Sequence, residues 1–286
     1  MKDLRRRLLL PCALMSLVVP LQAAHAVGFK FKETLELSEG VTMPLTWLKP
    51  EKSDVPARAL VILQHGMMRN AEKMMSLAQS LVERNIEVLL PGIKDPQYMD
   101  PLFPEMFVEA FEKKFSSSQS PDRPTKMLLA GFSAGARFLS HAANLFYKKQ
   151  KDLRGVLLLD PVVGGLPEQH LGPRLPLPYF AILAKPSRCN ADGNAFPLFE
   201  SGRFEAQGFR LKSASHCDFE GRSSDALCYL YCGSSPRQNA EAIRFFATEW
   251  ISGLIDSQNP HTDYLPGGKV FLQWQNQGLF DSIFSP

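Results

Sequence analysis

Continuous apolar runs alternate along the chain with segments in which apolar residues recur every three or four positions. The runs are rich in Val, Ile, Leu and Phe, as expected of strands that are buried on both faces of a sheet. They lie at 59–66, 86–92, 127–132, 155–161, 178–184 and 207–213. The helical segments lie at 70–84, where Asn70 is expected to cap the helix, and at 104–115, 134–150 and 236–254. This alternation predicts an α/β fold with a mostly parallel central sheet and helices on both of its faces.

The two ends of this region depart from the alternation. Segments 28–37 and 41–48 alternate between polar and apolar residues and predict an antiparallel pair of strands that opens the fold. The segment from about 257 to 286 is rich in Gly, Pro and Gln, and we expect it to be a packed C-terminal extension. No internal repeat and no long linker is evident, so residues 27–286 are expected to form a single domain.

The first 26 residues have the pattern of a signal peptide. A basic start, MKDLRRR, precedes the apolar run LLLPCALMSLVVPL, and Ala24-His25-Ala26 is a cleavage site of the small-x-small type. The run contains two prolines and is shorter than the roughly 20 residues that a membrane-spanning helix needs. We therefore expect cleavage near Val27, export to the periplasm or the medium, and no membrane span in the mature chain. An uncleaved anchor lying in the membrane interface is the alternative.

The net charge excludes one class of partner. The formal charge of +3 is carried entirely by the first seven residues, so residues 27–286 sum to zero. The chain has no basic stripe interleaved with aromatic residues, which nucleic-acid-binding surfaces typically have. Nucleic acid is therefore not an expected partner.

Export changes the interpretation of the cysteines. Four remain after the signal peptide, at Cys189, Cys217, Cys228 and Cys232, and an even number in an oxidising compartment indicates two disulfides. Cys228 and Cys232 lie four residues apart in an expected helical turn and are poorly placed to bond to each other. Each should pair with one of the other two, and the sequence leaves both such connectivities open. The spacing fits zinc sites poorly, and we expect neither a metal nor an organic cofactor.

The motif Gly-x-Ser-x-Gly occurs once, at 131–135, with Ser133 at its centre. A predicted strand ends directly before Ser133 and a predicted helix begins directly after it. In such a strand–turn–helix, small residues flank a serine whose hydroxyl projects above the sheet on a strained backbone. Ser133 is therefore the expected nucleophile.

A serine nucleophile needs a base to take its proton and a buried acid to orient that base. In this architecture the chain order is serine, acid, histidine. His216 follows the strand at 207–213 and lies at its carboxyl end, where open α/β sheets place their sites. The remaining histidines lie before the acid or in loops without a strand before them, so we expect His216 to be the general base.

Two aspartates compete for the role of the acid. Asp160 ends the apolar strand at 155–161, so its position would be fixed by the sheet. Asp192 lies in an Asn/Asp/Gly-rich loop after the next strand, where such residues favour turns for backbone reasons. We favour Asp160 and keep Asp192 as the alternative acid. Asp218, two residues after His216, is expected to support the site without contacting the nucleophile.

The oxyanion of a tetrahedral intermediate needs hydrogen-bond donors aimed at it. The backbone N–H of Ala134, next to the nucleophile, is one expected donor. The N–H of Met67 is the other, because Gly66 lets the chain turn sharply where the strand at 59–66 ends. Met68 and Phe132 are candidates, together with Met67, for an apolar wall suited to an acyl or aromatic group.

These segments resemble the α/β-hydrolase fold in its dienelactone-hydrolase-like and its chlorophyllase- and polyester-hydrolase-like branches. The resemblance covers roughly residues 45–255. QHGMMRNAEKMMSLAQSLVERNIEVLLPG resembles the first crossover segment of that fold, and GFSAGA its nucleophile elbow. LLLDPVVGG is similar to the segment of chlorophyllases and platelet-activating-factor acetylhydrolases in which the acid follows the strand after the elbow, which implies Asp160. SHCDFEG resembles the chlorophyllase histidine segment, whereas cutinase-like relatives carry the acid one strand later, which keeps Asp192 open.

The sequence therefore predicts an exported serine hydrolase that cleaves small-molecule or polymeric carboxylic esters through an acyl-enzyme. No large lid insertion is evident between 160 and 207, so we expect an open cleft. A thioesterase or peptidase with the same three side chains is the alternative among enzymes. A hydrolase fold that binds an apolar ligand without catalysis is the alternative outside them.

Overall fold

The computed structural model describes residues 28–51, 55–116, 124–164, 171–257 and 260–285. The expected signal peptide at 1–26 and the cleavage site before Val27 lie outside these residues.

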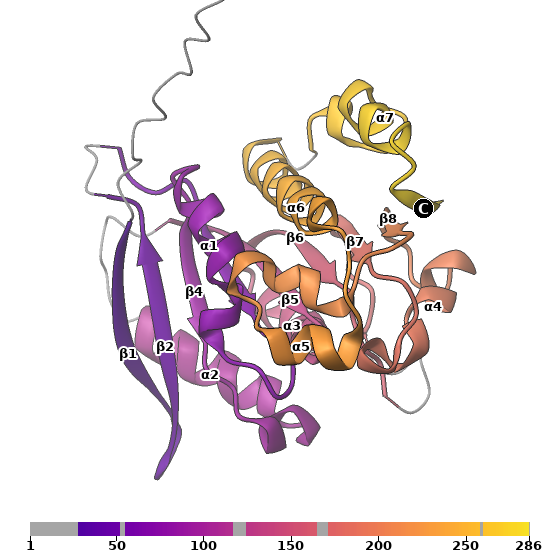
Figure 1. Cartoon of the computed structure of the whole chain (residues 1–286). Coiled ribbons are helices and arrows are strands. Elements are labelled where there is room, and N and C mark those ends of the chain that lie inside the picture. The colour runs from indigo at the N-terminus through magenta and orange to yellow at the C-terminus, as the bar shows by residue number, and fades with distance from the viewer. Residues whose placement is uncertain (1–27, 52–54, 117–123, 165–170, 258–259, 286) are drawn as a thin grey trace, which may run out of the picture.

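The described residues form a nine-stranded sheet that runs through the middle of the molecule (Figure 1). Its order is β1-β2-β4-β3-β5-β6-β7-β8-β9. Strands β4, β3, β5, β6, β7 and β8 pair in parallel, whereas β1, β2 and β9 join at the edges in antiparallel fashion. The strands are β1 (Phe29–Ser38), β2 (Val41–Lys49), β3 (Leu60–Gln64), β4 (Glu87–Pro91), β5 (Lys126–Phe132), β6 (Asp152–Leu159), β7 (Tyr179–Leu183), β8 (Gln207–Leu211) and β9 (Phe280–Phe284). The predicted mostly parallel sheet is therefore confirmed.

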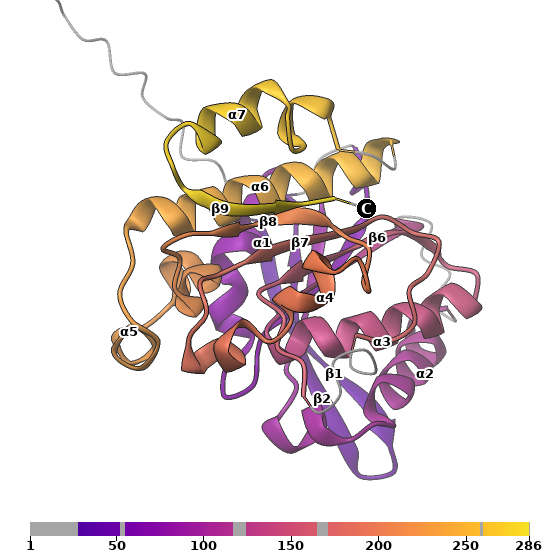
Figure 2. The ribbon, with the colours of Figure 1, turned by 90° about the vertical axis from the view of Figure 1, so that its right-hand side faces the viewer.

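Helices cover both faces of the sheet, as predicted. Helices α1 and α6 lie on one face, and α2 and α3 lie on the other (Figure 2). The α-helices are α1 (Met75–Val82), α2 (Phe103–Ser116), α3 (Ala134–Lys148), α4 (Phe196–Glu200), α5 (Ala226–Cys232), α6 (Arg237–Ser257) and α7 (Lys269–Gln275). The 3-10 segments are η1 (Ala71–Met74), η2 (Asp95–Met99), η4 (Arg188–Gly193), η5 (His216–Ser223) and η6 (Thr262–Tyr264). Within the described ranges, no helix combines the length and the apolar character that crossing a membrane requires.

Two segments differ in detail from the prediction. The helix expected at 70–84 begins as the 3-10 segment η1, and the Asn70 side chain caps it by accepting a hydrogen bond from the N–H of Glu72. The segment after 257 packs against the sheet, as expected, but it also contributes strand β9, which pairs with β8 (Figure 2). The ring of Phe271 from α7 is fully buried beside Phe209 of β8.

The burial of Phe271 predicts that the C-terminal segment stabilises the whole fold. Phe271→Ala should lower the free energy of unfolding by about 3–5 kcal/mol, because it leaves a cavity in an aromatic cluster. Chemical denaturation measures the loss. Leu272→Ala is the matched control, because Leu272 is 42% exposed and its truncation should change stability by about 0.5 kcal/mol or less. Equal effects of the two variants would mean that α7 is not part of the core.

Candidate active site

Ser133 lies in a sharp turn between β5 and α3, with φ 56° and ψ −125°. Non-glycine residues in such strained conformations cluster at active sites. Both flanking glycines are required by close packing. A Cβ on Gly131 would lie 2.5 Å from the Cα of Ala136, and one on Gly135 would lie 2.3 Å from the carbonyl oxygen of His65. The predicted strand–turn–helix around Ser133 is therefore present, with the geometry that Gly-x-Ser-x-Gly predicts.

Asp160 follows β6 and is anchored to the neighbouring strand β7. Its N–H donates to the carbonyl oxygen of Ile182 (2.8 Å), and its Oδ1 accepts from the N–H of Ala184 (3.0 Å). His216 is the first residue of η5, just beyond β8, and its Nδ1 lies 2.6 Å from Oδ2 of Asp160. Both side chains are buried. The structure thus brings the expected acid and the expected base into direct contact.

The imidazole of His216 also lies beside the turn that carries Ser133. The ring centroids of His216 and Phe132 are 4.5 Å apart, and Phe132 directly precedes Ser133. Within the described part of the chain, no hydrogen bond joins the Ser133 hydroxyl to the imidazole. Such bonds are often long or poorly aligned in a protein without substrate and tighten when substrate binds.

The two expected oxyanion donors flank Ser133. A Cβ on Gly66 would lie 2.8 Å from the Cβ of Ser133, so the chain that leads into Met67 passes close to Ser133. Ala134 is the first residue of α3, and the N–H groups of the first helical turn have no partner within the helix.

The two pocket candidates occupy different environments. Met68 is 81% exposed, and its N–H donates to Oδ1 of Asp95 (2.5 Å). Phe132 is only 2% exposed; its ring stacks on Phe219 (5.8 Å) and lies beside the imidazole of His216, tilted by 39° from it. Its side chain therefore packs against the His216 ring inside the fold and not in the wall of an open pocket, the place expected from the sequence. The alternation along β5 puts Phe132 on the same face of the sheet as Leu128 and Ala130, which α1 and α6 cover.

The loop after β7 contains both the alternative acid and a residue that the sequence analysis missed. Asp192 is exposed and adopts φ 56° in the kinked segment η4. Asn190, two residues earlier, is fully buried, and its side-chain amide contacts the Asp160 carboxylate. The Asn, Asp and Gly residues of this loop predict only a turn. The one signal in the sequence that this part of the loop is held in place is the neighbouring Cys189, which forms a disulfide.

Asp218 holds the backbone of the turn that begins with His216. Its Oδ2 accepts from the N–H of Ser215 (2.8 Å) and from the hydroxyl of Ser235, and its Oδ1 accepts from the hydroxyl of Tyr229 (3.1 Å). Burial raises the pKa of the Asp218 carboxyl, and these donors act in the opposite direction. Asp218 therefore binds the backbone and two hydroxyl groups next to His216.

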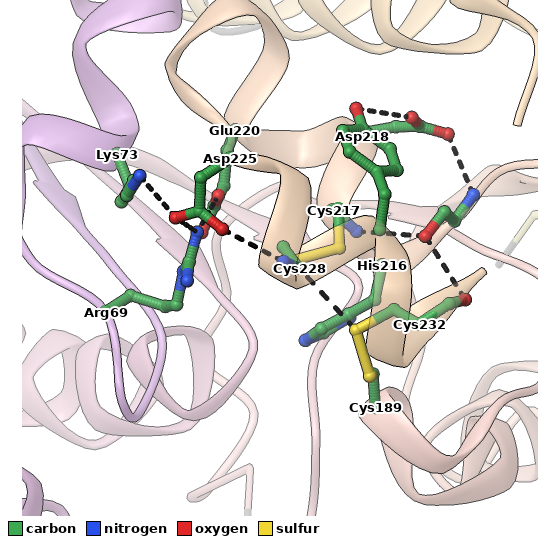
Figure 3. The surroundings of a disulfide bond; sticks show 12 residues. Arg69, Lys73, Cys189, His216, Cys217, Asp218, Glu220, Asp225, Cys228 and Cys232 are labelled. Carbon is green, nitrogen blue, oxygen red and sulfur yellow. Dashed lines mark hydrogen bonds and ion pairs between the residues drawn. A yellow bond between two sulfur atoms is a disulfide. The ribbon is translucent and has the colours of Figure 1, made fainter. Parts of the chain in front are cut away.

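A buried ion pair connects the loop after β3 to the same turn (Figure 3). The guanidinium of Arg69 donates two hydrogen bonds of 2.5 Å to the fully buried carboxylate of Glu220 in η5. Arg69 and Lys73 both pair with Asp225 at the start of α5. The bonds to Glu220 raise the pKa of Arg69. The loop that carries Met67 is therefore fixed relative to the segment that carries His216.

Two disulfides complete this region, Cys189–Cys232 and Cys217–Cys228 (Figure 3). Each of the two cysteines of α5 pairs with one of the others, as predicted. Cys217 adjoins His216, and Cys189 adjoins Asn190. The sulfur atoms of Cys217, Cys228 and Cys232 lie within 4.8 Å of one another, but each is already in a disulfide, so they do not offer free thiolates to a metal ion.

The loop lengths predict unequal contributions of the disulfides to stability. The bonds span 43 and 11 residues, and the loss of chain entropy in the unfolded state gives about 4 kcal/mol for the longer loop and about 3 kcal/mol for the shorter. Replacing Cys189 and Cys232 together by Ala should therefore destabilise the protein more than replacing Cys217 and Cys228, as measured by denaturant unfolding. The opposite order would show that the strain or packing of each bond outweighs loop length.

Comparison with known proteins establishes the fold. No family model matches the sequence, and no curated protein matches it. Among solved structures, one described as an arylesterase aligns with a TM-score of 0.55 and 16% identity, covering 82% of this chain and 85% of its own. An esterase from Pyrobaculum calidifontis aligns with a TM-score of 0.49 and 15% identity, over 65% of this chain and 76% of its own. At 16% identity the match to the arylesterase shows the fold alone, and this fold is α/β-hydrolase-like.

Proposed function

We propose that this protein is an exported serine hydrolase that cleaves carboxylic esters, with Ser133 as nucleophile, His216 as general base and Asp160 as the acid that orients the base. The observation that carries the proposal is the 2.6 Å contact between His216 Nδ1 and Asp160 Oδ2, made beside a serine in a strained strand–helix turn. Export is supported by the two disulfides, since such bonds persist in oxidising compartments.

The proposed reaction begins with proton transfer. With its Nδ1–H held by Asp160, the imidazole presents Nε2 as the base that takes the proton of the Ser133 hydroxyl. The serine oxygen bonds to the ester carbonyl carbon, and the carbonyl electron pair moves onto oxygen. The N–H groups of Met67 and Ala134 stabilise that negative charge.

The intermediate then collapses to an acyl-enzyme. The bond between the carbonyl carbon and the alcohol oxygen breaks, and the alcohol leaves with the proton held by His216. Water repeats the sequence: His216 takes its proton, the oxygen bonds to the acyl carbon, and the carboxylic acid departs as Ser133 recovers its hydrogen. Each step uses only side chains and backbone groups of this chain.

Apolar groups near the nucleophile support esters with an acyl or aromatic part as substrates. Met68 is highly exposed in the loop that passes close to Ser133, and a methionine side chain adapts to varied apolar shapes. The solved structure that shares the fold is described as an arylesterase, so aryl esters are the first substrates to test.

Ser133→Ala should abolish the hydrolysis of p-nitrophenyl esters and covalent labelling by a fluorophosphonate. The expected loss in kcat is about 10⁴-fold or more, because loss of the nucleophile leaves only binding and oxyanion stabilisation. Ser140→Ala is the matched control. Ser140 is also buried on the α3 side of the turn and donates to the carbonyl oxygen of Leu171, so its replacement should leave turnover and labelling near the wild-type level. Undiminished turnover in Ser133→Ala would exclude the proposed mechanism.

The identity of the acid has its own test. Asp160→Asn should lower kcat by about 10³- to 10⁴-fold, since a neutral amide stabilises neither the required tautomer nor the imidazolium. Asp192→Asn should leave kcat within about twofold, as is usual for an exposed residue away from the reacting groups. Steady-state kinetics of both variants on one aryl ester decide the matter, and a larger loss in Asp192→Asn would transfer the role to Asp192.

A further inference from the structure

We propose that Asn190 is the positioning residue for the acid: its side-chain amide holds the Asp160 carboxylate in the orientation in which Oδ2 accepts the ring N–H of His216. The inference rests on the proposed function and deepens it. Asn190 lies 30 residues after Asp160 in the sequence and is separated from it by strand β7.

The contacts of Asn190 converge on the acid. Its Nδ2 lies 3.1 Å from Oδ2 and 3.4 Å from Oδ1 of Asp160, and it also donates to the carbonyl oxygen of Lys185 (2.9 Å). The Ala184 N–H binds Oδ1 from the side of β7 (3.0 Å). The carboxylate therefore has a donor on each oxygen besides the imidazole, and its plane cannot rotate without breaking one of these bonds.

The orientation of the Asn190 amide is itself fixed. Its Oδ1 accepts from the N–H of Ser187 (2.8 Å) and from the N–H of Gly193 (3.0 Å). Turning the amide over would direct its oxygen at the Asp160 carboxylate and its NH₂ group at these two donors. Only one orientation satisfies every group, so Asn190 presents a donor to the acid at all times.

The chain around Asn190 is cross-linked to the chain around the base. Cys189 bonds to Cys232 at the end of α5, and Cys228 at the start of the same helix bonds to Cys217 beside His216 (Figure 3). The amide that holds the acid and the turn that carries the base thus belong to one covalently closed unit.

An asparagine suits this role electrostatically. A neutral donor satisfies the lone pairs of a buried carboxylate, yet it adds no positive charge beside the site where the imidazolium forms. A lysine or arginine in this position would stabilise the same carboxylate but would compete with the imidazolium for it.

Two Asn190 variants test the proposal against a control from the same loop. Asn190→Asp keeps the shape but sets a second carboxyl against Asp160, and Asn190→Ala removes the donor. Asn194→Ala is the control, because Asn194 binds the N–H (3.2 Å) and the carbonyl oxygen of Val163 and makes no hydrogen bond to Asp160 within the described residues.

Both Asn190 variants should lower kcat by about 10- to 100-fold with KM within about twofold, because Asn190 is fully buried and offers substrate no surface to bind. Asn190→Asp should also displace the acidic limb of the pH profile of kcat/KM, because repulsion between the two adjacent carboxyl groups changes the charge that Asp160 presents to His216. The downfield proton NMR signal of the His216 ring N–H should shift in both variants. Asn194→Ala should leave the limb and the signal at their wild-type positions.

The outcomes separate the inference from the proposed function. Suppose that the wild-type protein hydrolyses esters, but that the acidic limb and the NMR signal stay unchanged in the Asn190 variants or move equally in Asn194→Ala. Asn190 then only stabilises its loop, and the inference is overturned. If the wild-type protein hydrolyses no ester but the NMR signal shifts in the Asn190 variants alone, the positioning role stands and the proposed function fails. Should Asn190→Asp not fold, Asn190→Ala supplies the same NMR readout.

Discussion

The contact between Asp160 and His216 depends on the parallel register of the central strands. The N–H of Ser133 donates to the carbonyl oxygen of Leu159 at the end of β6, and the N–H of Asp160 donates to Ile182 in β7. Ile182 in turn pairs with Phe209 of β8, the strand that leads to His216. Because parallel strands all point their carboxyl ends to one edge of the sheet, the segments that carry Ser133, Asp160 and His216 all lie at that edge. The backbone hydrogen bonds of the sheet therefore determine where the main chain of Ser133, Asp160 and His216 lies.

Beyond that edge the sheet offers no support, and the loops are held by other means. A chain segment outside regular structure loses about 1–2 kcal/mol of entropy for every residue that it fixes. Here that cost is offset by the Arg69–Glu220 ion pair and by the two disulfides that end on α5. All of these connections involve η5 or α5. The segment that carries His216 is thus the most heavily cross-linked part of the candidate site.

The strands and the elbow could be predicted because their signals are local. Each central strand is an apolar run that is buried on both faces, and Ser133 lies within one short motif. Strand β9 could not be predicted, since the five residues FDSIF show no regular alternation of polar and apolar positions and become a strand by pairing with β8. Asn190 was missed for a similar reason. Its neighbours in sequence indicate a turn, whereas its role depends on a carboxylate 30 residues away. The disulfide connectivity likewise depends on distances that spacing alone does not contain.

The buried carboxylates of Asp160 and Asp218 both lie near His216, but they make different hydrogen bonds. The carboxylate oxygens of Asp218 accept hydrogen bonds from the N–H of Ser215 and from the hydroxyls of Ser235 and Tyr229, so Asp218 fixes the backbone of the turn. Asp160 contacts the ring itself, with neutral donors on its remaining positions. If both carboxylates faced the imidazole, repulsion between like charges would drive one of them to take up a proton. Because Asp218 faces the backbone, Asp160 is the one carboxylate that contacts Nδ1 of His216 within the part of the chain that the structure describes.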